Sequence, residues 1–193
     1  CAVCFGTLEF KRLLACPGCG EQNSLGEFCS KCTDGNLNGL WYAQNYGHPL
    51  IKQTIKACKY DSLTELITPL GDLLVGTLRA FSLPPAWHSV ARDQWQLTPV
   101  PLAASKQRLR GFNQAELLAR YTSEQCNLPI SLALIRTRAT KKQSEFKKDT
   151  QRLNNVQGAF ALSPNQDAHD QIYILVDDVY TSGATMQECA HVL

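Results

Sequence analysis

Apolar and polar positions separate a short, cysteine-rich beginning of the chain from a longer part with regular patterns. Residues 1–39 contain few large apolar side chains, whereas apolar residues recur at helical spacing in 48–59 and again over about 62–82. We expect the inward side chains of these two helices to be Leu50, Ile51, Ile55, Cys58, Leu63, Leu66, Ile67, Leu70, Leu73, Leu74 and Leu78. The outward positions of the first helix are Lys52, Lys56 and Lys59.

Continuous apolar runs predict the strands of a sheet. Residues 171–176 read Gln-Ile-Tyr-Ile-Leu-Val without alternation, which is typical of a strand buried on both faces in a parallel sheet. Residues 96–101 predict another strand, whose prolines place its end at the edge of the sheet, and residues 40–46 have strand character too. Helices are expected from 114 through 121 and from about 185 onward. This order predicts an α/β fold, a mainly parallel twisted sheet flanked by helices.

Composition places these elements in one domain with a small appendage. A chain of 193 residues with 44% hydrophobic residues is long enough to bury such a core. The net charge of +2 is too small to identify a nucleic-acid-binding protein by itself. No apolar run reaches the thickness of a bilayer, so we expect no membrane insertion.

Six of the nine cysteines form three pairs in which two residues separate the partners. The pairs are Cys1/Cys4, Cys16/Cys19 and Cys29/Cys32, and the other cysteines are Cys58, Cys126 and Cys189. A tight turn between paired thiols presents both sulfurs to a tetrahedral Zn²⁺, so we assign one structural zinc ion to Cys16, Cys19, Cys29 and Cys32. The spacing is that of a zinc ribbon rather than a secreted disulfide scaffold, and it favours a reducing, cytoplasmic location.

Cys1 and Cys4 supply only half of a second zinc site. We expect their partners upstream, which makes residues 1–39 a truncated double ribbon; a free pair or a redox dithiol is the alternative. Gly20, after Cys19, is expected to free backbone N–H groups for the thiolates. In so short a segment the metal replaces a missing core, so the ribbon is interpreted as a folding staple.

Candidate chemistry lies at the end of the strand predicted for 171–176. Asp177 and Asp178 follow that strand, and a loop of small residues leads into the last helix: Thr181, Ser182, Gly183, Ala184 and Thr185. Strand, small-residue loop and helix start form an anion site, because glycine lets the backbone approach the ligand and free N–H groups face it. Two acids beside such a site suit ribose hydroxyls or the waters of a Mg²⁺ ion. The alternative is an ordinary strand with an acidic turn.

Two basic stretches are further candidates. Lys106, Arg108 and Arg110 precede a glycine and a helix start, which predicts a second anion site or else a solvated basic turn. Seven cations oppose only two acids over residues 136–152: Arg136, Arg138, Lys141, Lys142, Lys147, Lys148 and Arg152. This stretch is either a flexible basic cover over an anion or a solvated surface helix.

Residues 176–185 resemble the phosphoribosyl-diphosphate (PRPP) signature of type I phosphoribosyltransferases. The likeness implies that Asp177 and Asp178 hold the ribose hydroxyls with Mg²⁺ nearby, and that Thr181 to Thr185 bind the 5′-phosphate. Residues 99–102 and 110–115 are similar to ComF/GntX-type competence-associated proteins, in which a zinc ribbon precedes a phosphoribosyltransferase domain. The resemblance implies such a domain over 40–193, without the closing strand expected after the last helix.

By the same resemblance, the segment after Pro101 is the loop that receives diphosphate, with Arg110 as its cation. Residues 136–152 are then a mobile hood, in which Arg152 is the favoured PRPP ligand. Asp177, Asp178 and Arg110 would then be the catalytic residues of an Mg²⁺-dependent phosphoribosyltransferase. Thr181 stands where some relatives place an acidic base, so the acceptor is not identified. The alternative is a non-catalytic module that binds single-stranded DNA or a helicase partner during DNA uptake.

Overall fold

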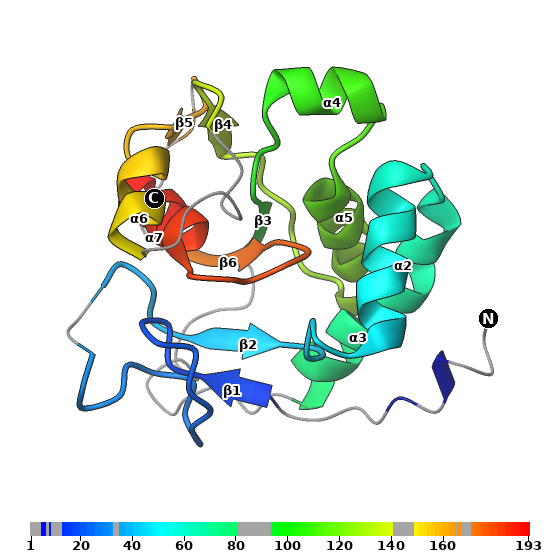
Figure 1. Ribbon diagram of the computed structural model, residues 1–193, viewed down its shortest axis with the longest axis horizontal. Helices are drawn as coiled ribbons and strands as arrows, with labels where there is room; N and C mark the ends of the chain where they lie inside the picture. The colour runs from blue at the N-terminus through cyan, green and yellow to red at the C-terminus, as the bar shows by residue number, and fades with distance from the viewer. Residues whose placement is uncertain are drawn as a thin grey trace.

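The computed structural model describes residues 5–6, 8, 13–32, 35–80, 94–140, 149–164, 166 and 171–193, which form a mixed α/β structure (Figure 1). The strands are β1 (Leu13–Ala15), β2 (Leu40–Tyr42), β3 (Trp95–Pro99), β4 (Leu134–Arg136), β5 (Phe160–Leu162) and β6 (Ile172–Val176). The helices are α2 (Pro49–Tyr60), the 3-10 helix η1 (Thr64–Leu66), α3 (Ile67–Ala80), α4 (Ala104–Arg110), α5 (Gln114–Cys126), α6 (Asp149–Val156) and α7 (Ala184–Val192).

A parallel pair of strands lies at the centre of the fold. β3 pairs with β6 so that Trp95 faces Ile172 and Pro99 faces Val176. On the other edge of β3, Leu97 forms a parallel bridge with Ile130. The prediction of parallel strands at 96–101 and 171–176 is confirmed to this extent. The other two sheets among the described residues, β1–β2 and β4–β5, are antiparallel, so the structure is a mixed α/β fold with small sheets.

The β6 strand is less buried than its sequence predicts. Only Val176 is buried, and the four residues before it are partly exposed. Within the described part of the chain β6 has a ladder partner on one edge alone, which is β3. A hollow of about 390 Å³ also borders its residues from Ile172 to Leu175. An edge position therefore explains why a continuous apolar run is not fully covered.

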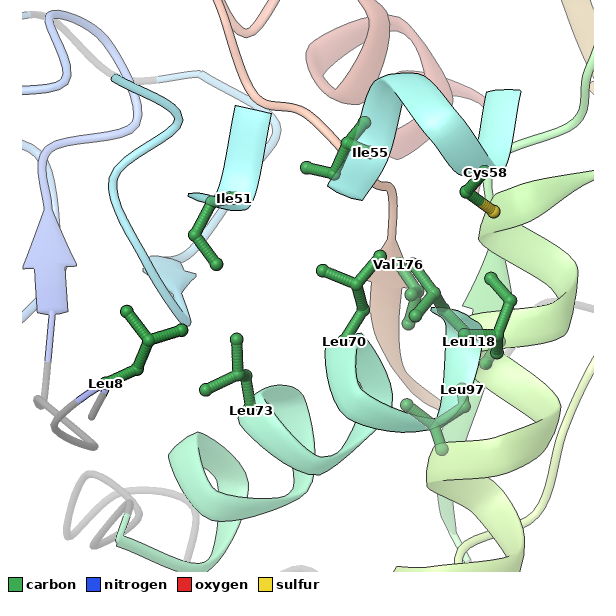
Figure 2. Packing of buried hydrophobic residues seen from close by; sticks show 11 residues of the cluster. Leu8, Ile51, Ile55, Cys58, Leu70, Leu73, Leu97, Leu118 and Val176 are labelled. Carbon is green, nitrogen blue, oxygen red and sulfur yellow. The ribbon is translucent and has the colours of Figure 1, made fainter. Parts of the chain in front are cut away.

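Helices α2, α3 and α5 lie on one side of the parallel pair, and α6 and α7 lie on the other (Figure 1). The main core joins the first three helices to the two strands through side chains such as Ile55, Leu70, Leu97, Leu118 and Val176 (Figure 2). A second cluster, formed by Val100, Leu134, Ala159, Phe160 and Cys189, joins β4 and β5 to α7.

A glycine brings α3 and α5 close together. A Cβ on Gly71 would overlap the ring of Tyr121, whose hydroxyl donates to Asp72 Oδ1 at 2.5 Å. The predicted inward face of these helices is confirmed for Ile51, Ile55, Cys58, Ile67, Leu70 and Leu73, which are buried. Leu63 was expected inside and is exposed, because the chain turns through η1 before α3 begins.

β2 begins at the predicted boundary between residues 39 and 40 and pairs with β1, inside the predicted ribbon. One sheet therefore crosses that boundary, and the division into two domains stays a prediction. Among the described helices, none is long and apolar enough to cross a membrane.

Candidate functional site

The acid pair lies at the carboxyl end of the parallel strands, where it was predicted. Val100 N–H donates to Val176 O at 2.9 Å, so the ends of β3 and β6 are held side by side just before Asp177. Asp178 N–H donates to Asp177 Oδ1 at 2.8 Å. Burial, together with the neighbouring Asp178 carboxylate, raises the pKa of Asp177 to about 8. A carboxyl with that pKa is mostly protonated at neutral pH, so a cation that binds beside Asp177 would have to displace its proton.

Asp178 has an ion-pair partner that the sequence did not predict. Lys59 Nζ lies 2.5 Å from Asp178 Oδ2, and the two side chains are only 21% and 12% exposed. Lys59 was expected on the outward face of its helix together with Lys52 and Lys56. The other two lysines are exposed, but Lys59 belongs to the last turn of α2 and reaches the end of β6.

The small-residue loop connects the acid pair to α7. Gly183 is the N-cap of α7 and adopts φ 74°, a left-handed conformation that favours glycine. A Cβ at Gly183 would overlap the Tyr180 hydroxyl. The Ser182 hydroxyl is buried and has no hydrogen-bond partner within the described structure. A buried hydroxyl without a partner at a helix start is what an anion-binding loop without its ligand should show.

Thr181 to Thr185 are thus brought together with the acids, as predicted. Thr181 is exposed and Thr185 is partly buried, whereas Gly183 and Ala184 are buried. The loop presents backbone at its centre and hydroxyls at its edges.

Arg110 lies at the end of a helix, not in the loop that was expected after Pro101. Residues Ala104–Arg110 form α4, which ends at Gly111 with φ 85°. Arg110 Nη1 donates to Gln114 Oε1 at 2.5 Å, and its guanidinium lies 5.9 Å from the centre of the Tyr60 ring. The seven residues of α4 make about two turns, although Ala103 supplies no side-chain cap, so the diphosphate loop was predicted with the wrong local structure.

Asn113 holds the segment after Arg110 against the end of β3. Its side chain caps α5 by accepting from Ala115 N–H at 3.2 Å, and its Nδ2 donates to Val100 O at 3.0 Å. The start of α5 and the end of β3 are therefore tied by one buried side chain. This places Arg110 and Gln114 at the same end of the parallel pair as Asp177.

The predicted hood is only partly described. Lys141, Lys142, Lys147 and Lys148 lie outside the described residues. Arg136 is in β4, where its guanidinium stacks 5.0 Å from the Phe160 ring centre. Burial lowers the pKa of Arg136, and the Asp177 carboxylate opposes that effect. Arg138 donates to Gln157 O at 2.5 Å.

These contacts hold the two arginines at the start of the stretch, and the mobile hood over 136–152 stays a prediction. Arg152 lies on α6, the helix that packs against α7, and is partly buried. Its predicted contact with PRPP stays a prediction.

Four cysteines form a metal-binding cluster at the predicted positions. The sulfurs of Cys16, Cys19, Cys29 and Cys32 all lie within 4.8 Å of one another. Cys19 Sγ and Cys29 Sγ are 3.8 Å apart, which equals the edge of about 3.8 Å expected for a tetrahedron with metal–sulfur bonds of about 2.3 Å. The donor set and its dimensions fit a metal such as zinc. Cys1 and Cys4 lie outside the described residues.

Backbone donors point at one of these sulfurs. Gly18 N–H and Cys29 N–H each donate to Cys16 Sγ at 3.3 Å. Burial raises the pKa of Cys16, but the N–H groups of Cys29, Cys19 and Gly18 outweigh it and lower the pKa to about 6. Gly20 adopts φ 73° and donates its own N–H to Cys16 O at 2.8 Å, so it closes the turn and leaves the N–H groups before it to the thiolate.

The turn between Cys16 and Cys19, called the cysteine knuckle below, contacts the segment that leads into the small-residue loop. Tyr180 Oη donates to Pro17 O at 2.6 Å across 163 positions of sequence. Further along, Asn36 N–H donates to Gln187 Oε1 at 3.0 Å. The cysteine-rich segment therefore contacts both the residue just before the small-residue loop and the first turns of α7. Nothing in the sequence spacing indicated this contact, because the two residues are far apart in the chain.

A pocket of about 420 Å³ separates the ribbon from the acid pair. Gly20, Tyr42, Tyr46 and Ile55 border it on one side, and the segment from Asp177 to Thr181 borders it on the other. Its described lining residues include no Lys, Arg or His. Apart from Asp177 and Asp178 themselves, the pocket is lined by uncharged and partly aromatic residues, and neither Lys59 nor Arg110 is among them.

Comparison with known proteins identifies similar chains over nearly the full length. The chain is 31% identical to competence protein ComFC of Bacillus subtilis over 92% of this chain and 70% of that protein. It is 29% identical to competence protein F of Haemophilus influenzae over 100% and 90% of the two chains, and 31% identical to DNA utilization protein YhgH of Escherichia coli over 100% and 83%. No family model matches the chain, and no solved structure matches it significantly. The identity and coverage show that this chain belongs to the ComF family of competence-associated proteins.

Proposed function

We propose that the chain binds PRPP with Mg²⁺ and transfers its phosphoribosyl group to an acceptor. One observation carries this proposal: Asp177 and Asp178 adjoin a glycine-containing loop with an unpartnered buried hydroxyl, at the carboxyl ends of two parallel strands. Ligands of open α/β sheets bind at that edge. The loop suits the 5′-phosphate and the acids suit the ribose hydroxyls, as in the type I phosphoribosyltransferase fold that we propose for this domain.

The acid pair also fits Mg²⁺. Carboxylate oxygens are ligands that this ion prefers, and a divalent cation beside Asp177 would oppose the burial that raises its pKa. Asp177 and Asp178 would hold the ion directly or through its waters. When bound, Mg²⁺ would supply positive charge for the diphosphate oxygens.

The chain's own residues would stabilise the separating charges. As the bond between C1 and the diphosphate oxygen breaks, its electron pair leaves with diphosphate and the sugar becomes oxocarbenium-like. Arg110 would stabilise the leaving group, and the two carboxylates would stabilise the cationic sugar. The acceptor then donates an electron pair to C1 and loses its proton to solvent, because Thr181 offers no base. The uncharged pocket beside the acids provides room for that acceptor.

The names of the relatives favour a role in DNA uptake or utilisation, which we extend to this chain. A second candidate follows from them: a non-catalytic module that binds single-stranded DNA or a helicase partner through its basic segments. In either case we propose one structural zinc ion on the four-cysteine cluster and a reducing, cytoplasmic location.

Calorimetric titration with PRPP, with and without Mg²⁺, tests the proposal. We expect Mg²⁺-dependent binding that Asp178→Asn weakens by at least about tenfold, since that variant loses a charge-assisted contact. Glu124→Gln makes the same charge change on the exposed face of α5 and should bind normally. Absence of PRPP binding, combined with single-stranded DNA binding that Asp178→Asn does not alter, would support the module instead.

A further inference from the structure

The ion pair between Lys59 and Asp178 occupies the place where the proposed function needs a free carboxylate. Its 2.5 Å distance and the low exposure of both side chains make it a defined contact and not a surface encounter. We propose that Lys59 is a further binding residue of this site: it neutralises Asp178 when no ligand is bound and transfers to the diphosphate when ligand enters. This inference rests on the proposed function.

Lys59 lies beside the cation already assigned to diphosphate. Its neighbour Tyr60 carries the ring against which Arg110 stacks. Burial raises the pKa of the Cys58 thiol, and this thiol also feels the nearby charges: Asp178 and Glu65 raise its pKa further, whereas Arg110 and Lys59 lower it. The end of α2 therefore brings a second cationic side chain, Lys59, close to both Asp178 and Arg110.

The side-chain amide of Gln114, next to Arg110, has an N–H group without an acceptor. Gln114 is only 4% exposed, and its Oε1 accepts from Arg110, but its Nε2 has no hydrogen-bond partner in the described structure. Burying an amide donor without an acceptor costs free energy, so such a group in a polar site indicates a missing acceptor. A phosphate oxygen next to Arg110 would satisfy it.

Lys59 cannot serve both partners at once. An ammonium group at 2.5 Å from Asp178 Oδ2 blocks that oxygen from a ribose hydroxyl or a hydrated divalent cation. Once displaced, a partly buried ammonium needs another anion, because a buried charge without a partner is costly. Diphosphate on the neighbouring Arg110 meets that need. Lys59 thus weakens the binding of Mg²⁺ alone but strengthens the binding of Mg²⁺ and diphosphate together.

The test uses two probes on the zinc-loaded chain: Mg²⁺ alone and inorganic pyrophosphate in the presence of Mg²⁺. For Lys59→Met we expect Mg²⁺ alone to bind about tenfold more tightly and pyrophosphate about tenfold more weakly, each equivalent to the loss of one charge-assisted contact. Lys59→Arg should retain pyrophosphate binding. Lys56→Met, an exposed position on the same helix, is the matched control and should change neither affinity.

The opposite signs separate a ligand-exchange role from a structural one. Equal weakening of both probes in Lys59→Met, together with a lower melting temperature, would make Lys59 a structural residue and overturn the inference. So would unchanged affinity for both probes. If the wild-type chain binds neither PRPP nor pyrophosphate, the proposed function fails first and the inference fails with it; wild-type binding with an unaffected Lys59→Met refutes the inference alone.

Discussion

One hydroxyl, that of Tyr180, connects the turn between Cys16 and Cys19 to the segment just before the small-residue loop. Tyr180→Phe is therefore the sharpest test of whether metal binding at the cysteines and the stability of that segment are coupled. The hydroxyl donates to Pro17 O at 2.6 Å. Burial, with smaller contributions from Cys16 and Cys19, raises the pKa of Tyr180 to about 12, so the group stays protonated and able to donate at neutral pH. Phe fills the same space without the donor.

The expected loss follows from the burial of this bond. A hydrogen bond contributes about 1 kcal/mol net, and leaving a buried carbonyl such as that of Pro17 unpaired raises the cost to at most about 3 kcal/mol. For a chain of 193 residues, 1 kcal/mol shifts the melting temperature by about 2–4 °C. By linkage, zinc should bind about fivefold more weakly to Tyr180→Phe, because 1 kcal/mol corresponds to that factor.

The assay compares melting temperatures of wild type and variant with zinc and after chelation. If the proposed zinc ion organises the four-cysteine segment that carries Pro17, the substitution should cost stability only in the zinc-loaded protein. Competition with a chromogenic chelator measures the change in zinc affinity. Tyr46→Phe, which removes a hydroxyl from an exposed ring, is the control. Equal destabilisation with and without zinc would refute the coupling.

Four further predictions concern single groups. Mg²⁺ binding at pH 7 should release about 0.9 proton, because a carboxyl with a pKa near 8 is mostly protonated there; calorimetry in buffers of different ionisation enthalpy counts it, and zero release contradicts it. In the ligand-free protein the raised pKa of Asp177 gives a contribution to stability that is fully present below the ordinary carboxyl pKa of 3.8 and is lost as the pH rises through about 8. The free energy of unfolding should therefore fall between these two pH values, and Asp177→Asn should abolish the fall. Gly183→Ala should cost more stability than Gly158→Ala, since both positions have positive φ, worth about 1–3 kcal/mol, but only Gly183 also has Tyr180 in the space of the new Cβ; equal losses in chemical denaturation would remove the steric argument. Cys29→Ser should lower bound zinc from about one ion per chain to none by elemental analysis, whereas Cys126→Ser, outside the cluster, should keep it.

The parts of the site that are local in sequence were predictable. The acid pair follows a five-residue apolar strand, and the loop follows the acids, so their proximity depends on a few consecutive residues. The cysteine pairs were predictable for the same reason, since each pair spans a single turn. A short-range pattern determines these positions without knowledge of the rest of the fold.

The contacts between distant elements were not predictable. Helical spacing assigns Lys59 to the outward face, and only the position of the end of α2 next to β6 turns it inward. Tyr180 meets Pro17 through packing of segments 163 residues apart. The local structure of Ala104–Arg110 was mispredicted because basic side chains suggested a ligand loop, whereas the backbone there continues as a helix.

The bond from Tyr180 to Pro17 also has a consequence for the order of events on the ribosome. Pro17 is synthesised long before Tyr180, so the proposed metal can bind the four cysteines before their partner segment has left the ribosome. In a cell starved of zinc, Tyr180 would therefore meet a segment that no metal has organised. Metal supply would then decide whether the residues between the acid pair and α7 are held in their folded conformation.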